Sequence, residues 1–94
     1  MPDASVSVMQ FIEKLLLFRG ARDISCRVYP PAANLRTYSV ILEGHQYREQ
    51  FYLDARQVEE FAKTGEERYI LTEVRAALRN LEKQIIKRKA SRRH

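Results

Sequence analysis

The sequence predicts a single α+β domain, in which helices pack on one face of a three-stranded antiparallel sheet in the order α-β-β-β-α-α. Three observations predict this fold. Apolar residues recur with helical spacing near both ends of the chain, and they alternate with polar residues in the middle. A chain of 94 residues has room for one hydrophobic core. We expect one domain over residues 1–86 and a basic C-terminal tail over residues 87–94.

The first helix is expected from Ser5 or Ser7 to Arg19. Either serine could act as the N-cap, because a serine hydroxyl accepts hydrogen bonds from the free N–H groups of a first turn. Gly20 follows at the position where a left-handed residue commonly ends a helix. One face of this helix is apolar at helical spacing and comprises Val8, Phe11, Ile12, Leu15 and Leu16.

Three strands are expected next, over residues 23–29, 35–42 and 46–53. Pro30-Pro31 ends the first strand, because proline has no N–H group to donate to a ladder. Gly44-His45 is expected to form the two-residue turn between the second and third strands, with glycine supplying a positive φ.

This turn predicts a register that starts with Glu43 opposite Gln46. One face then pairs Leu42 with Tyr47, Val40 with Glu49, and Tyr38 with Phe51. The other face pairs Ile41 with Arg48, Ser39 with Gln50, and Thr37 with Tyr52. The first face is mostly apolar and the second mostly polar. Glu49 is the exception, and we expect it at the sheet edge or beside a polar partner.

Two helices complete the fold. Asp54 and Gln57 have capping-box spacing at the start of a short helix, with Val58, Phe61 and Ala62 facing inward. Thr64-Gly65 ends this short helix. Thr64 and Glu67 again have capping-box spacing, and they precede a long helix over residues 66–90. The apolar stripe of that helix comprises Leu71, Val74, Leu78, Leu81 and Ile85, widened by Ile70, Ala77 and Ile86. Such a helix is longer than the strands, so we expect its basic end to extend past the sheet.

The positive charge is concentrated at the C-terminal end of the chain. The formal net charge is +5. Residues 1–82 carry 11 Lys and Arg against 12 Asp and Glu, a net charge of −1, whereas residues 83–94 carry six cations and no acid. A cluster of this density binds phosphate backbones electrostatically. The alternative is a solvated helix end whose cations complement the helix dipole.

The residue inventory argues against catalysis, metal binding and cofactors. Cys26, His45 and His94 are the only Cys and His residues, too few for the usual zinc cages. Cys26 falls on an apolar strand face, where we expect an inert thiol, and His45 falls in a turn. We therefore expect no enzyme activity, no cofactor and no small-molecule substrate.

The location is expected to be intracellular and reducing, specifically cytoplasmic. A single cysteine cannot form an internal disulfide framework. We find no secretory signal near the N-terminus and no apolar segment of the roughly 20 residues that a membrane-spanning helix needs. We therefore expect no membrane partner.

The predicted function is a small RNA- or DNA-binding module. Tyrosine and arginine side chains on the sheet face away from the helices could stack on bases or hold phosphates. The alternative for this face is an ordinary solvated sheet surface. The candidate residues of the sheet face are Arg27, Tyr29, Arg48, Gln50 and Tyr52. Those of the basic end are Lys83, Lys87, Arg88, Lys89, Arg92 and Arg93.

The alternative function is a non-catalytic protein-interaction module, such as a dimer, an adaptor or an inhibitor. It would join its partner through the sheet face or through Leu81, Ile85 and Ile86 on the last helix, where the helix leaves the sheet. The two functions differ in one feature. Nucleic-acid binding is favoured if Arg27, Arg48 and the basic end form one continuous positive surface, and it is weakened if acids interrupt that surface.

The predicted α-β-β-β-α core resembles the topology of double-stranded-RNA-binding domains and of the small Alu-domain proteins of the signal recognition particle. Leu42-Glu43-Gly44 and the segment from Asp54 to Phe61 are similar to the hairpin and following helix of the second group. That resemblance implies an RNA-binding sheet face and a heterodimer. The chain departs from both groups at the Thr64-Gly65 break with its extra helix. It also carries Glu66-Glu67 where double-stranded-RNA-binding domains have two lysines.

Overall fold

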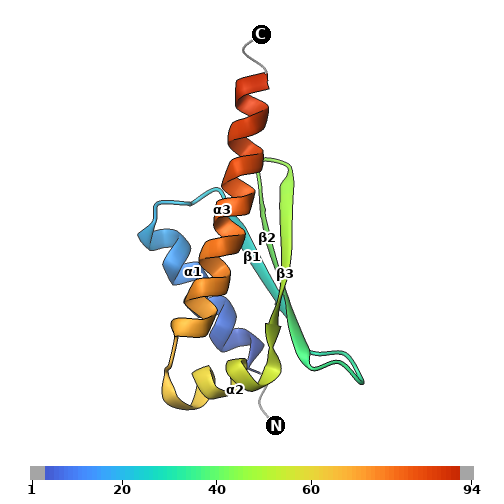
Figure 1. The fold of residues 1–94 in the computed structure, drawn as a ribbon. Coiled ribbons are helices and arrows are strands. Elements are labelled where there is room, and N and C mark those ends of the chain that lie inside the picture. Colours follow the sequence, from blue (N-terminus) through green and yellow to red (C-terminus); the bar gives the residue numbers. More distant parts are fainter. Residues whose placement is uncertain (1–3, 92–94) are drawn as a thin grey trace.

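The computed structural model describes residues 4–91, with side chains through Lys87, and it confirms the predicted order of elements (Figure 1). The elements are α1 (Ser5–Phe18), β1 (Ser25–Tyr29), β2 (Thr37–Gly44), β3 (Tyr47–Asp54), α2 (Ala55–Thr64) and α3 (Arg68–Ser91). The sheet has the order β1-β2-β3, and both strand pairs are antiparallel.

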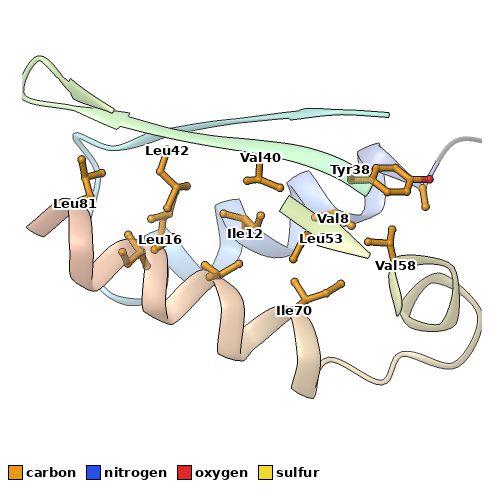
Figure 2. Packing of buried hydrophobic residues seen from close by; sticks show 14 residues of the cluster. Val8, Ile12, Leu16, Tyr38, Val40, Leu42, Leu53, Val58, Ile70 and Leu81 are labelled. Atoms are coloured by element: carbon orange, nitrogen blue, oxygen red, sulfur yellow. The ribbon is translucent and has the colours of Figure 1, made fainter. Parts of the chain in front are cut away.

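All three helices lie on the same side of the sheet (Figures 1 and 2). Helix α1 packs against β1, and α3 packs against β3 and β2. The predicted α+β architecture with one uncovered sheet face is therefore confirmed.

The core lies between these two layers (Figure 2). Helix α1 contributes three residues at four-residue spacing, which brings them onto one face. Strand β2 alternates strictly between buried and half-buried residues, as expected for a central strand covered on one side. The buried residues include Val8, Ile12 and Leu16 of α1, Tyr38, Val40 and Leu42 of β2, Leu53, Val58, and Ile70, Val74, Ala77, Leu78 and Leu81 of α3.

The predicted hairpin register is wrong by two residues. The structure pairs Gly44 with Tyr47, so the turn is His45-Gln46, and Leu42 lies opposite Glu49. Both turn residues have positive φ, 53° and 69°, which is the backbone of a type I′ turn. Since strand side chains alternate with a period of two, this shift leaves every residue on its predicted face. The predicted assignment of residues to the two sheet faces is therefore correct, although the predicted cross-strand pairs are wrong.

Gly44 explains why the turn lies one residue later than predicted. It is buried, and its φ is not positive. A Cβ atom there would lie 3.0 Å from the Asp23 carbonyl oxygen and 3.1 Å from Ile24 Cγ1. Gly44 thus allows the segment before β1 to approach β2 closely, and it is not needed for the turn itself.

The predicted helix caps differ in detail. The N-cap of α1 is Ala4, and Ser5 is buried in the first turn, so no serine side chain caps this helix. Asp54 is the N-cap of α2 but makes no capping side-chain bond. Before α3, the Glu66 N–H donates to Thr64 Oγ1 at 3.2 Å, and the Arg68 N–H donates to Glu66 Oε1 at 3.2 Å. Glu66, and not Glu67, therefore supplies the carboxylate at this helix start.

Helix α3 extends past the β2–β3 hairpin, as its length predicts (Figure 1). Its buried stripe is centred on Ile70, Val74, Ala77, Leu78 and Leu81, whereas Leu71 and Ile85 are only half-buried. Ile86 is exposed, and so is Ala62 of α2, which was expected to face inward. The helix continues through residues 86 and 87 to Ser91.

Candidate nucleic-acid interface

The open sheet face brings the five predicted strand residues together in rows across the strands. Because β2 pairs with both neighbours, each of its residues has a partner on either side. The three rows are Tyr29–Ser39–Tyr52, Arg27–Ile41–Gln50 and Ser25–Glu43–Arg48. Tyr29 and Tyr52 are 46% and 57% exposed and flank a small serine. The Gln50 amide donates to Ser39 Oγ at 3.3 Å and so links the first two rows.

Acidic side chains interrupt the positive charge of this face. Glu43 lies on the central strand directly beside Arg48, and Asp54 follows Tyr52 on the same face of β3. Two cations and two acids leave the open face without net formal charge. The open face is therefore aromatic and polar, but it is not a basic surface.

Helix α3 carries a basic row that begins well before the predicted basic end. Arg75, Arg79, Lys83 and Lys87 are each four residues apart, and all four are exposed. Residues at this spacing are neighbours on a helix surface, so the side chains form one ridge about 18 Å long. We call these four residues the basic row. It faces away from the core, because it lies opposite the buried stripe of α3.

The basic row is unfavourable for an isolated helix. Like charges four residues apart destabilise a helix by about 0.2–0.5 kcal/mol per pair. Among the described residues, no ion pair joins Arg75, Arg79 or Lys83 to an acid. The nearby Glu82 carboxylate instead faces Arg19, at 3.6 Å. Stability of the helix therefore does not explain the charges of Arg75, Arg79 and Lys83.

Two members of the basic row, Arg75 and Arg79, were missed by the sequence analysis. Their charge does not show in the net charge of residues 1–82, because the acids of that segment balance it. The signal was the repeated four-residue spacing of cations within a helix. Arg75 and Arg79 thus extend the basic end by two helical turns toward the N-terminus of α3.

The basic end and the open face belong to different layers. Lys83 and Lys87 are exposed on α3, in the helical layer. Arg88 and Lys89 lie on α3, but their side chains are outside the described part, as are Arg92 and Arg93 entirely. The structure groups Arg27, Tyr29, Arg48, Gln50 and Tyr52 on the sheet, and it does not join them to Lys83 and Lys87. Arg27, Arg48 and the described part of the basic end therefore do not form the continuous positive surface that would favour nucleic-acid binding, which weakens the sheet face as a nucleic-acid contact.

The predicted protein-contact residues of α3, which are Leu81, Ile85 and Ile86, differ in how far they are buried. Leu81 is completely buried, because α3 still covers the sheet at this point, and so it cannot meet another chain. One turn later, the Gln84 amide donates to Glu49 Oε2 at 3.1 Å, which gives Glu49 the polar partner that the pattern required. Ile85 still packs against the core, and Ile86 alone of the three is largely exposed, at 65%.

Cys26 and His45 lie in different surroundings. Cys26 is half-buried beside a groove of about 330 Å³ between α1 and the start of β1. Burial, and to a lesser extent the charge of Glu13, raise the pKa of its thiol from 9.0 to about 12. The His45 ring is paired with the Asp23 carboxylate. Within the described residues, no group of three Cys, His, Asp or Glu residues could hold a metal ion.

No protein-family model, curated protein or solved structure matches this chain. None of the helices that the structure describes has the length and apolar character to cross a membrane.

Proposed function

We propose that this protein binds nucleic acid through the phosphate backbone, with the basic row of α3 as the main contact surface. The observation that supports this proposal most directly is the row itself: four exposed cations on one ridge, spaced so that they repel one another. Phosphates placed along the ridge would relieve that repulsion and release counterions.

Nucleic acid fits this surface better than a membrane does. Membrane-surface helices present a large apolar face to the lipid. The apolar stripe of α3 is buried in the core. The residues beside the row, Thr72, Ala76 and Asn80, are exposed and small, so a phosphate backbone can approach the helix closely.

The test is the salt dependence of binding to duplex DNA, duplex RNA and single strands. Replacing Arg75, Arg79, Lys83 and Lys87 with glutamine removes up to four phosphate contacts. Each contact contributes about −0.9 for duplex DNA, or about −0.7 for single strands, to the slope of log affinity against log salt. We expect the slope to flatten by as much as about 2.8–3.6 with no loss of stability.

The matched control replaces four exposed cations outside the row, namely Arg22, Arg36, Arg56 and Lys63. Both variants lose the same charge, so only its position differs. The control should keep a steeper slope than the row variant. Equal slopes would contradict the proposed surface, and so would an intact protein without salt-sensitive binding at low ionic strength. A loss of affinity on Tyr29→Ala at every salt concentration would show that the open face also makes contact, through stacking.

A further inference from the structure

Strand β3 forms one edge of the sheet within residues 4–91, because only β2 pairs with it. Edge strands are usually protected from further pairing by charged side chains, especially lysine, by inward-pointing charges, by proline, by bulges or by short length. Strand β3 is eight residues long, contains no proline, glycine or lysine, and pairs with β2 without a bulge. Its one inward charge, Glu49, is held by the Gln84 amide at 3.1 Å. The outward backbone groups of β3 are therefore available to another strand.

The backbone hydrogen bonds show which residues of β3 face that edge. The Ala55 N–H donates to the Arg36 carbonyl at 2.8 Å, which continues the β2–β3 ladder by one residue. Since bonded and non-bonded residues alternate in an antiparallel pair, odd-numbered β3 residues bond to β2. The N–H and C=O groups of Arg48, Gln50 and Tyr52 consequently point outward.

Tyr69 of α3 closes one end of this edge. Its hydroxyl accepts a hydrogen bond from the Asp54 N–H at 2.9 Å, and Asp54 is the next residue of the outward series. The groups available for pairing are thus those of Arg48, Gln50 and Tyr52. They form a set that is symmetrical about Gln50.

The opposite edge, β1, is less suited to pairing. It is five residues long and is followed by Pro30-Pro31. Its odd-numbered residues bond to β2 by the same alternation, so only Cys26 and Val28 of the strand present outward groups.

We propose that β3 pairs antiparallel with β3 of a second copy of this chain, with the two-fold axis at Gln50. This register uses all the outward groups of Arg48, Gln50 and Tyr52 in both chains. It leaves the Asp54–Tyr69 bond intact, whereas a shift toward Asp54 would compete with that bond. The two sheets become one six-stranded sheet, and the inference does not depend on nucleic-acid binding.

The side chains are self-complementary in this register. Arg48 lies opposite Tyr52 of the second copy, and the symmetry repeats the pair. An arginine beside a tyrosine ring makes a favourable cation–π contact. A shift by two residues in one direction would instead place Glu49 opposite Glu49, which is unfavourable. The two Arg48–Tyr52 pairs, and the avoidance of a Glu49–Glu49 pair, therefore favour a second copy in this register.

The first measurement is the mass of the full chain in solution as a function of concentration. We expect twice the 11.1 kDa of one chain. Gln50→Pro should give a folded monomer, because the Gln50 N–H points outward and proline is tolerated at such edge positions. A monomeric intact protein at all accessible concentrations would overturn the proposal, and so would a dimer that survives this substitution unchanged.

Two glutamate variants test the register even if proline disturbs the strand. Gln50→Glu places two carboxylates face to face at the axis, whereas Tyr52→Glu places a carboxylate opposite Arg48. Both add one negative charge to the same exposed face of β3. The dissociation constant of Gln50→Glu should exceed that of Tyr52→Glu by about 3- to 30-fold. Equal constants, or the reverse order, would overturn the register.

Discussion

Gly44 and the two residues after it decide the geometry of the hairpin. Glycine is the residue most often associated with positive φ, yet here His45 and Gln46 adopt it. The left-handed conformation costs an ordinary residue roughly 1–2 kcal/mol. Gly44 is needed where it is because the Asp23 carbonyl and Ile24 leave no room for a Cβ atom. The His45–Asp23 pair further fixes the turn against the segment before β1.

Gln46→Gly should therefore stabilise the protein, by about 0.5–1 kcal/mol. Glycine adopts a φ of 69° without the steric cost, although part of the gain is offset by the greater freedom of the unfolded chain. Gln46→Ala removes the same side chain but keeps the steric cost, so it should give no gain. Urea unfolding of both variants measures the difference, and an equal effect would contradict the type I′ turn.

Helix α3 has two distinct sides along its length. The buried stripe fixes the helix on β2 and β3, and the opposite side carries the basic row. Because the helix is about 36 Å long and the strands are about 26 Å, its last turns lie beyond the sheet. The transition falls between Leu81, which is fully buried, and Ile86, which is largely exposed.

Leu78→Ala should destabilise the fold by about 2–5 kcal/mol, because it removes a fully buried side chain from a core that can close the cavity only in part. Ile86→Ala is the matched control on the same helix and should change stability by less than about 0.5 kcal/mol. Chemical denaturation measures both. A small loss at Leu78, or a large loss at Ile86, would show that α3 is docked differently on the sheet.

At the scale of the whole molecule, two proposed working surfaces lie on different parts of the domain. The basic row belongs to the helical layer, and the β3 edge belongs to the sheet. A dimer through β3 would carry two basic rows in one particle. Linking two binding surfaces raises the affinity for a ligand that spans both, with no new contact.

The two proposals together predict that ligand length matters. Gln50→Pro changes no charge and lies outside the basic row, so binding through the row alone should keep the affinity of the intact protein for a nucleic acid that covers only one row. For a nucleic acid long enough to reach both rows, the affinity should fall at least about tenfold. Binding measured on a series of lengths at fixed salt decides this. A loss that is the same at every length would contradict the bivalent arrangement.

The sequence by itself determined the elements, their order and the sorting of residues between the two sheet faces. These features depend on local periodicity: the apolar face of α1 at helical spacing, and the alternation from Thr37 to Gly44. The sheet face on which each β3 residue lies was predicted correctly, although the register of β3 was not. The error in register was two residues, and strand side chains alternate with a period of two.

Only the tertiary structure decided what depends on contacts between distant segments. The hairpin register depends on the approach of Asp23 and Ile24 to Gly44, and the burial of Leu81 depends on where the sheet ends beneath α3. The partner of Glu49 is 35 residues away, at Gln84. The separation of the open face from the basic end follows from the layering of helices on one side of the sheet. A local sequence pattern does not predict such contacts between distant segments. Periodicity predicts the face on which a side chain lies, whereas the packing of the whole domain decides which residues it contacts.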